Sequence, residues 1–418
     1  MDTLGLRIRQ LRKEQKLTLE ALAGTKLTKG MLSLIENGKA QPSMESLSYI
    51  AQRLGVESSE LMDDVSHTEK RNILEKVEKL YKVGFNELTD EHQHIVDLIH
   101  PIIDKLTHGY VSARLIEIYS RCSYNLKRED WEIHYNRALQ LYEQLHLYNQ
   151  GASLALFKGM IQFNKHNYSE ALAIILEEHA RFDTPTIKLD AMTTLDYMYI
   201  ESILYSAVGN YEQARLKMHE ALTFSKEERI FYRIDDLYRL AGFQAIINGN
   251  EEDRAYYLLK VRQYGEFAEN KYSIAIAELL DAHYYNSYAH DYQNALVSIE
   301  KFLELGKEID AEKPNHEDNN HYLLEKGKSL YGLGNVEEAL KLLEAYKVPN
   351  YLHHPYDLSM SYEVHSYRAL CHAHLGDMDS ALKEAKIGQD LIAELPDTPY
   401  KTFIVKTYTD IQKSSDSQ

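Results

Sequence analysis

A short turn signature recurs along most of the chain. It has the form Gly/His-Asn/Asp-x-x-x-Ala and is flanked on both sides by apolar residues at helical spacing. Its copies end at Ala171, Ala214, Ala255, Ala295, Ala339 and Ala381, the copy at Ala255 (GNEEDRA) being looser, and a degenerate copy places Trp131 at the alanine position. The intervals between copies are 40 to 44 residues. This period predicts stacked helical hairpins, each of which buries its apolar faces against its neighbours.

Small residues support the same register. Gly159, Ser202, Gly327 and Ala369 each lie twelve residues before the alanine of their copy. Together with the turn residues, this pattern resembles the tetratricopeptide repeat, whose standard period is about 34 residues. The longer period here implies longer helices. HEAT-like repeats would share the period but not the turn signature, so we expect a right-handed tetratricopeptide-repeat superhelix.

The N-terminal residues follow a different pattern, typical of five short amphipathic helices. Thr18 and Thr28 stand where hydroxyl side chains cap helix N-termini, and Asn37-Gly38 can close a helix at its C-terminus. We therefore expect an all-α chain with four parts. These are a five-helix domain over 1–62, a linker over 63–70, the repeat domain over 71–413 and a disordered tail over 414–418.

The first domain resembles the Cro/C1-type (XRE) helix-turn-helix family. The resemblance rests on I-x-x-L-R at 8–12, T-L-E-A-L-A at 18–23, S-L-I-E-N-G-K at 33–39 and A-x-x-L-G-V at 51–56. It implies that the third helix enters the major groove of DNA and that nearby groups contact phosphates. The DNA-binding residues that it implies are Thr18, Thr28, Lys29, Gly30, Met31, Ser33, Asn37 and Lys39.

The same resemblance implies a structural ion pair between Arg12 and Glu36. Two residues depart from the family pattern. Leu19 stands where many members carry glutamine, and Gly30 lies inside the recognition helix, where glycine costs about 1 kcal/mol relative to alanine. A single module of this kind binds DNA weakly, so we expect dimerisation through the repeat domain and a palindromic DNA target.

Charge divides the chain in the same way. Residues 1–62 hold nine Lys/Arg and seven Asp/Glu, a net of +2, while the 418-residue chain carries −17, which leaves −19 on the remainder. The negative charge of the remainder would repel nucleic acid, so binding is expected only near the N-terminus. The acidic surface of the remainder is equally explained by a need for solubility. The two cysteines form no framework, no apolar run is long enough to span a bilayer and no signal peptide is apparent. We expect a cytoplasmic protein.

The usual ligand of such a repeat array is an extended peptide held on its inner face. The 32 tyrosines gather on the first helices of the predicted hairpins and suit either a binding groove or ordinary packing, with packing favoured for any single one. Residues eleven before each turn alanine are expected to face inward. The candidate peptide-binding residues are Asn136, Asn164, Tyr199, Gln244, Tyr284, Asn286 and Lys328.

No catalytic pattern emerges from the sequence. His92-x-His94 and His372-x-His374 resemble metal pairs, but side chains two residues apart diverge on a helix and no third ligand is evident. Phosphate-binding glycine loops, nucleophile elbows and H-E-x-x-H are not found. We therefore expect no enzyme activity, no cofactor and no metal.

The two parts together look like the RRNPP family of peptide-sensing regulators of Gram-positive bacteria, and the length is similar to that of its NprR-like branch. The resemblance implies a quorum-sensing transcription regulator, a homodimer or higher oligomer, that binds palindromic DNA and a short signalling peptide pheromone. Two alternatives remain open. The repeats could bind or dephosphorylate a phosphorelay response regulator, as in Rap-like members, or the chain could be a phage or mobile-element repressor controlled by a protein antagonist.

Overall fold

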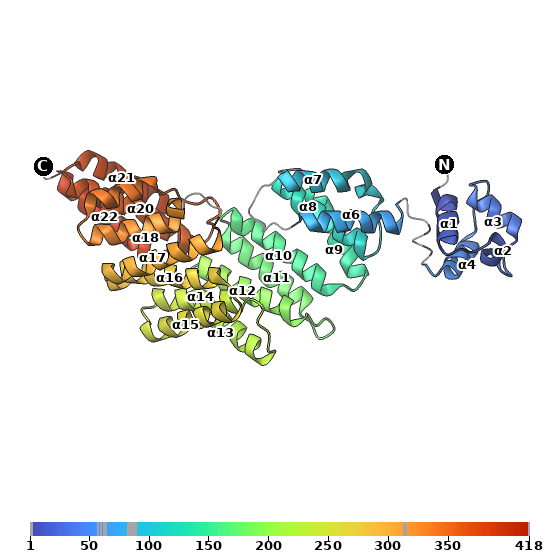
Figure 1. Ribbon diagram of the computed structural model, residues 1–418, viewed down its shortest axis with the longest axis horizontal. Helices are drawn as coiled ribbons and strands as arrows, with labels where there is room; N and C mark the ends of the chain where they lie inside the picture. Colours follow the sequence, from blue (N-terminus) through green and yellow to red (C-terminus); the bar gives the residue numbers. More distant parts are fainter. Residues whose placement is uncertain are drawn as a thin grey trace. The chain divides into compact units, whose positions relative to one another are not determined.

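The computed structural model describes residues 3–56, 58, 61, 65–81, 90–311 and 316–416. Over these residues the chain is α-helical, and its single β feature is an isolated bridge between Thr184 and Ile187 (Figure 1). None of the helices in this described part is long and apolar enough to cross a membrane. The all-α prediction is confirmed. Internal contacts divide the chain into two compact units, Met1–Leu154 and Ala155–Gln418, which we describe separately.

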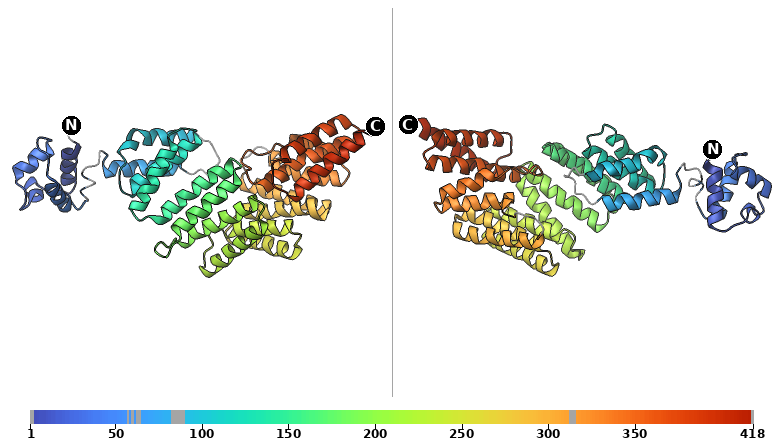
Figure 2. Two further views of the ribbon diagram at one scale, coloured as in Figure 1. Left: turned by 180° about the vertical axis from the view of Figure 1, so that it is seen from behind. Right: turned by 45° about the horizontal axis from the view of Figure 1, so that its top comes forward.

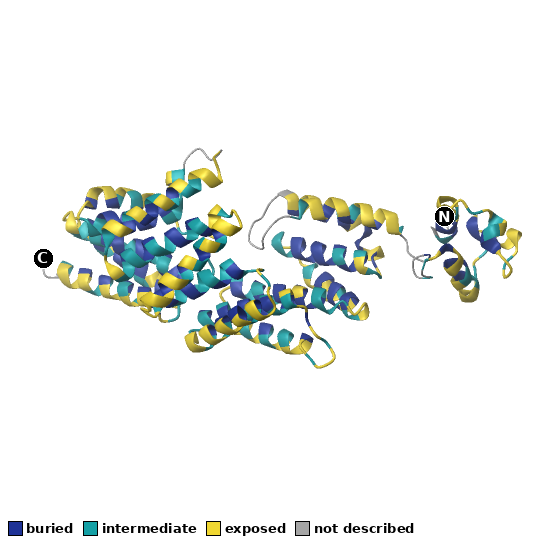
Figure 3. Cartoon of the chain, turned by 60° about the horizontal axis from the view of Figure 1, so that its bottom comes forward, coloured by how far each residue is buried: buried dark blue, intermediate teal, exposed yellow. Residues whose placement is uncertain are grey.

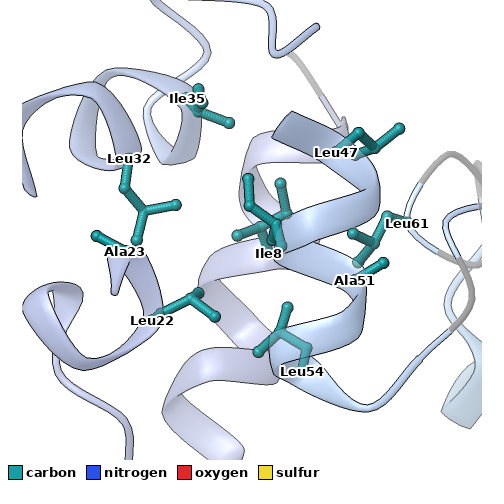
Figure 4. Close-up of a cluster of buried hydrophobic side chains, with 10 residues drawn as sticks. Ile8, Leu22, Ala23, Leu32, Ile35, Leu47, Ala51, Leu54 and Leu61 are labelled. Atoms are coloured by element: carbon teal, nitrogen blue, oxygen red, sulfur yellow. The ribbon is translucent and has the colours of Figure 1, made fainter. Parts of the chain in front are cut away.

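Four helices of the N-terminal domain, within the first unit, are described in full. They are α1 (Thr3–Glu14), α2 (Leu19–Ala23), α3 (Lys29–Glu36) and α4 (Met44–Leu54). Their apolar faces meet in one core, in which Ile8, Leu22 and Leu32 are completely buried (Figure 4). Of the expected fifth helix, only Ser58 and Leu61 lie within the described residues, and both are helical.

Side-chain caps explain where these short helices begin. The Thr18 hydroxyl accepts a hydrogen bond from Ala21 N at 3.0 Å, and the Thr28 hydroxyl accepts one from Met31 N at 3.1 Å. Each bond satisfies a backbone N–H that the helix itself leaves unpaired. The turn between α2 and α3 is therefore fixed by local chemistry that is visible in the sequence.

The rest of the first unit is also helical. It contains α6 (His67–Leu80), α7 (Asp90–Ile99), the 3₁₀ helix η1 (His100–Lys105), α8 (Tyr110–Asn125), α9 (Trp131–Gln144) and the start of α10 (Tyr148–Asn164). Helix α6 begins inside the segment predicted as a linker, because the Ser66 hydroxyl accepts a hydrogen bond from Glu69 N at 3.1 Å and caps it. The linker prediction is therefore wrong for residues 67–70.

Antiparallel hairpins fill the second unit, and successive helices lie side by side in chain order (Figure 2). The helices are α11 (Tyr168–Phe182), α12 (Ala191–Ala207), α13 (Tyr211–Glu227), α14 (Ile234–Ile247), α15 (Glu251–Phe267), α16 (Lys271–Tyr284), the π helix η2 (Tyr285–Ala289), α17 (Tyr292–Ile309), the 3₁₀ helix η3 (His316–Asp318), α18 (Asn320–Gly332), α19 (Val336–Ala345), α20 (Pro355–His374), α21 (Met378–Ile392) and α22 (Pro399–Asp416). Helix α22 continues through residues 414–416, so these three residues are not the disordered tail that the sequence predicts.

The turn signature marks the start of the second helix of each hairpin. At Ala214 the backbone N–H donates to the carbonyl of the capping Asn210 at 3.0 Å, and the other regular copies repeat this bond. In the looser copy the bond comes from Arg254 N to Asn250 O, also at 3.0 Å. Arg254, rather than Ala255, therefore stands at the alanine position. In the degenerate copy, the His134 N–H donates to the Asp130 carbonyl. His134 therefore stands at the alanine position that the sequence assigns to Trp131.

A second register shift arises at the π helix η2. A π turn inserts one extra residue into a helix, and here it lies between α16 and the turn that ends at Ala295. The buried small residue of this hairpin is accordingly Ala282, thirteen residues before Ala295 instead of twelve. The inner-face register predicted for Gln244 and Tyr284 is thus one residue too late, and Phe243 and His283 take those places.

Small residues occur where the two helices of a hairpin approach closely. A β-carbon at Gly327 would lie 2.7 Å from Leu343 Cδ2, and one at Gly242 would lie 3.0 Å from Leu258 Cδ2. At the equivalent position of another hairpin, the Ser202 hydroxyl on α12 donates to the Ala214 carbonyl on α13 at 2.8 Å. Buried residues follow these helix contacts, and exposed residues cover the outer helix faces (Figure 3).

We expect Gly327→Val to destabilise the repeats by about 1–3 kcal/mol, because the added atoms have no space beside Leu343. Gly30→Ala is the matched control, since nothing lies within 4 Å of its would-be β-carbon and alanine favours a helix by about 1 kcal/mol. Urea denaturation followed by far-ultraviolet circular dichroism measures both. An unchanged unfolding midpoint for Gly327→Val would contradict the close approach.

Candidate functional site

Helix α3 presents one buried face and one open face. Leu32, Ile35 and Glu36 are buried against the core of the N-terminal domain. On the other side, Gly30 has open space around it and Leu34 is 44% exposed. Of the residues predicted to contact DNA, all are exposed except Ser33, which is half-buried; the exposed ones are Thr18, Thr28, Lys29, Gly30, Met31, Asn37 and Lys39.

The ion pair that the family resemblance implies is present. Arg12 Nε donates to Glu36 Oε1 at 2.6 Å, and Arg12 Nη2 donates to Glu36 Oε2 at 2.9 Å. A third bond runs from Arg12 Nη1 to the Leu17 carbonyl at 2.8 Å. The hydrogen bond with Glu36 raises the pKa of Arg12. A planar two-bond contact of this kind fixes orientation, so it ties α1 to the end of α3 and holds the open face of α3 in place.

Polar groups at the two ends of α3 already have partners. Lys29 Nζ lies 2.5 Å from Glu20 Oε1, and both side chains are exposed. The hydrogen bond from Lys29 lowers the pKa of Glu20. At the other end, Asn37 Nδ2 donates to the Ser33 carbonyl at 2.7 Å. Water competes with a surface pair such as Lys29–Glu20, so the lysine can exchange Glu20 for another partner.

The residues predicted to bind a peptide do not form one cluster. Asn136 is exposed on α9 in the first unit, whereas the other six lie in the second. Tyr284 covers Arg254, with 4.0 Å from its ring centre to Cζ, and Tyr199 stacks against Arg233 at 5.0 Å. Asn164 is half-buried at the end of α10.

Lys328 and Asn286 lie deep inside the second unit, in a group that we call the buried ion cluster. It consists of His283, Asn286, Glu325, Lys328 and Glu363, all of them buried. Lys328 Nζ lies 3.0 Å from Glu363 Oε2 and 3.3 Å from Glu325 Oε1. His283 connects Glu325 Oε1, at 2.9 Å from Nδ1, to the Tyr400 hydroxyl, at 2.8 Å from Nε2. The cluster joins α16, η2, α18 and α20, and the bond to Tyr400 connects it to α22.

Both amide atoms of Asn286 are used inside this cluster. Its Nδ2 donates to the carbonyl and to the carboxylate of Glu325, each at 2.8 Å, and its Oδ1 accepts from the Ser329 hydroxyl at 2.8 Å. Burial alone would raise the pKa of Glu325, but Lys328, His283 and Asn286 hold it at about 2. Burial likewise opposes the charge of Lys328, whose pKa is nevertheless raised by Glu325 and Glu363. The cluster is therefore charged at neutral pH.

Residues far apart in the second unit also meet at the segment between α19 and α20. The Tyr168 hydroxyl donates to the His353 carbonyl at 2.8 Å, and His354 Nε2 lies 3.3 Å from the Ile203 carbonyl. The Tyr356 ring packs against Phe243, with 6.0 Å between ring centres. Ile203 and Phe243 occupy the same register position once the shift at Arg254 is applied. The sequence assigns this inner-face position to Gln244, but in the structure Phe243 holds it and faces the contact with Tyr356.

A hollow of about 690 Å³ opens between α13, α14 and α15. It is lined by charges of both signs, amides and aromatic rings: Tyr211, Glu212, Arg215, Met218, His219, Ala241, Gln244, Ala245, Asn248, Asn250, Asp253 and Tyr257. Gln244 Oε1 is buried there and has no hydrogen-bond partner among the described residues. At the rim, the Tyr211 hydroxyl donates to the Asp397 carbonyl at 2.8 Å. The hollow contains one residue predicted from sequence, Gln244.

No group of three or more His, Cys, Asp or Glu residues suited to a metal occurs in the described part of the chain. Cys122 and Cys371 are both buried and unpaired with each other. Burial raises the pKa of each thiol to about 12, so neither is a thiolate at neutral pH.

We expect Glu325→Gln to lower the free energy of unfolding by about 3 kcal/mol at pH 7, following the depressed pKa of this carboxyl. Because its pKa in the folded state lies below the ordinary value of 4.5, the stabilisation is present above pH 4.5 and is lost as the pH falls towards 2. Urea denaturation at pH 7, 5 and 3 measures it, with the exposed Glu344→Gln as control. A difference from wild type that stays constant over this range would refute the role of the charge.

A family model described as "Helix-turn-helix" matches residues 8–61. A comparison with curated proteins finds no match. Among solved structures, Bacillus thuringiensis PlcR in complex with the peptide PapR7 and DNA is 18% identical, with 75% of this chain and 100% of that chain covered and a TM-score of 0.35.

ComR from S. thermophilus, in complex with DNA and its signalling peptide ComS, is 18% identical, with 67% of this chain and 98% of that chain covered and a TM-score of 0.35. A Pyrococcus horikoshii signal transduction ATPase with a tetratricopeptide repeat sensor is 13% identical, with 99% of this chain and 64% of that chain covered and a TM-score of 0.47. The family match and the geometry together identify residues 8–61 as a helix-turn-helix domain, which is followed in this chain by helical repeats.

Proposed function

We propose that the chain is a peptide-responsive transcription regulator. The observation that carries the proposal is the open face of α3 in a domain that matches the helix-turn-helix family. An α-helix fits the major groove of DNA, and a helix capped by Thr28 and held by the Arg12–Glu36 pair can enter it without rearranging. Regulation by a peptide follows from the resemblance to RRNPP regulators and from the repeats.

In this proposal, one set of side chains recognises the base sequence, and another fixes the position of the protein on the DNA. Lys29, Met31 and Ser33 face the bases, while Thr18, Asn37 and Lys39 contact phosphates. The excess of basic residues is confined to 1–62, which favours this end of the chain for a polyanion. Two copies joined through their repeats would place two recognition helices on a palindromic site.

We propose the hollow between α13 and α15 as the peptide site. Its volume lies within the range of about 300–1,000 Å³ that is usual for ligand pockets. The unpartnered Gln244 Oε1 can accept a hydrogen bond from a peptide N–H, and Arg215 and Asp253 offer both charges at the border. Because Tyr211 both lines the hollow and bonds to the Asp397 carbonyl, a peptide that displaces Tyr211 would weaken the contact with the C-terminal hairpin.

DNA binding is tested with duplexes selected from a random-sequence pool by the full chain. We expect Lys39→Ala to weaken binding to all duplexes alike and to reduce the slope of log affinity against log salt by about 1, as for one lost phosphate contact. The exposed repeat residue Lys301 supplies the control, Lys301→Ala. The same titration gives the number of chains per palindrome, expected to be two. Unchanged affinity in Lys29→Ala/Ser33→Ala would contradict the proposal.

Peptide binding is tested with a library of synthetic short peptides screened first against the wild-type chain. We expect Gln244→Leu to weaken the selected peptide about fivefold, because a buried hydrogen bond contributes about 1 kcal/mol. Gln389→Leu is the matched control, since Gln389 Oε1 is also buried without a partner but lies on α21. Calorimetric titration measures both variants. Equal losses in the two would place the peptide elsewhere.

A further inference from the structure

The outermost stripe of α3 carries one large apolar side chain, Leu34, between a glycine and an asparagine. Gly30, Leu34 and Asn37 recur at the spacing i, i+4, i+7 on the side opposite the buried Leu32 and Ile35. Leu34 is 44% exposed, and its neighbour Met31 is 46% exposed. A helix of eight residues thus directs two large apolar side chains outward. The sequence pattern predicts a base-facing role for Met31 but not for Leu34.

The polar groups beside this stripe are engaged within the domain. Lys29 pairs with Glu20, Asn37 Nδ2 donates to the Ser33 carbonyl, and the Thr28 hydroxyl accepts from Met31 N. Gly30 has no side chain to offer. On the stripe itself only Asn37 has a polar side chain, and its amide nitrogen is already bonded, whereas Leu34 and the neighbouring Met31 offer apolar contact.

Building on the proposed DNA-binding function, we propose that Met31 and Leu34 recognise thymine by contact with its 5-methyl group. In the major groove this methyl is an apolar group that distinguishes thymine from the other bases, and apolar side chains recognise it by van der Waals contact. The local charge favours DNA over other partners, because the stripe lies between Lys29 and Lys39 in the part of the chain with net positive charge. The half-site is then one with thymine opposite Leu34 and Met31.

Deoxyuridine provides a direct probe, since it keeps every hydrogen-bonding group of thymine and lacks only the methyl. A duplex selected by the full chain is resynthesised with uracil at one thymine at a time, and affinities are measured at one fixed salt concentration. We expect a loss of about fourfold at one or two positions in each half-site, the factor that corresponds to ~0.8 kcal/mol for one buried methyl-sized group.

Protein variants then connect each methyl to a side chain. In Leu34→Ala or Met31→Ala, the loss caused by uracil is expected to disappear at the matching position, while binding to duplexes without that thymine stays unchanged. Both side chains are exposed, so truncation leaves the core intact. Met44→Ala is the matched control, because Met44 is 64% exposed at the start of α4, and it should retain the full uracil effect.

The outcomes separate the two proposals. Specific binding with no uracil effect at any position overturns methyl recognition and leaves the DNA-binding function standing. Failure of the chain to retain any specific duplex overturns both. If Leu34→Ala changes self-association, measured by light scattering, and leaves the uracil effect intact, the stripe is a protein contact and methyl recognition is wrong.

Discussion

The close approach of paired helices in the repeats governs the second unit. Two helices of a hairpin can come this near only where one of them carries a small residue, such as Gly327 against Leu343 or Gly242 against Leu258. Once that position is set, helical geometry decides which side chain lies next to it and points inward. Ile203, Phe243, His283 and Lys328 hold that neighbouring place in successive hairpins, and they lead to the contact with Tyr356 and to the buried ion cluster.

Much of this arrangement could be predicted from the sequence because it depends on local chemistry. The capping threonines, the turn Asn and Asp residues and the alanine after them act within a few positions, so the hairpins and the helix-turn-helix boundaries follow from pattern alone. The Arg12–Glu36 pair could be anticipated from a family resemblance, although the two residues are 24 positions apart.

The remaining features depend on single-residue insertions and on distant contacts. One extra residue in the looser turn places Arg254 at the alanine position. The π helix adds another residue before Ala295. Neither insertion changes the spacing of the apolar residues enough to be recognised in the sequence. Lys328 and Asn286 look like polar groups for a ligand, but residues from α16, α18 and α20 bond to them inside the unit. The exposure of Leu34 is likewise not predicted by the sequence, because an apolar residue on an amphipathic helix is normally assigned to the core.

Gly30 has a consequence for how such a protein can change over generations. Gly30 lies in the first turn of α3, the helix proposed to bind DNA; a β-carbon built there meets nothing within 4 Å among the described residues, and its backbone angles are those of an ordinary helix. A single codon change there adds a side chain to the open face of α3 without disturbing the core, and most replacements favour the helix over glycine. Under the proposed DNA-binding function, new DNA-sequence preferences are therefore accessible in one mutational step with no loss of stability, so duplicated copies of the protein can diverge in their DNA targets while the folded domain stays the same.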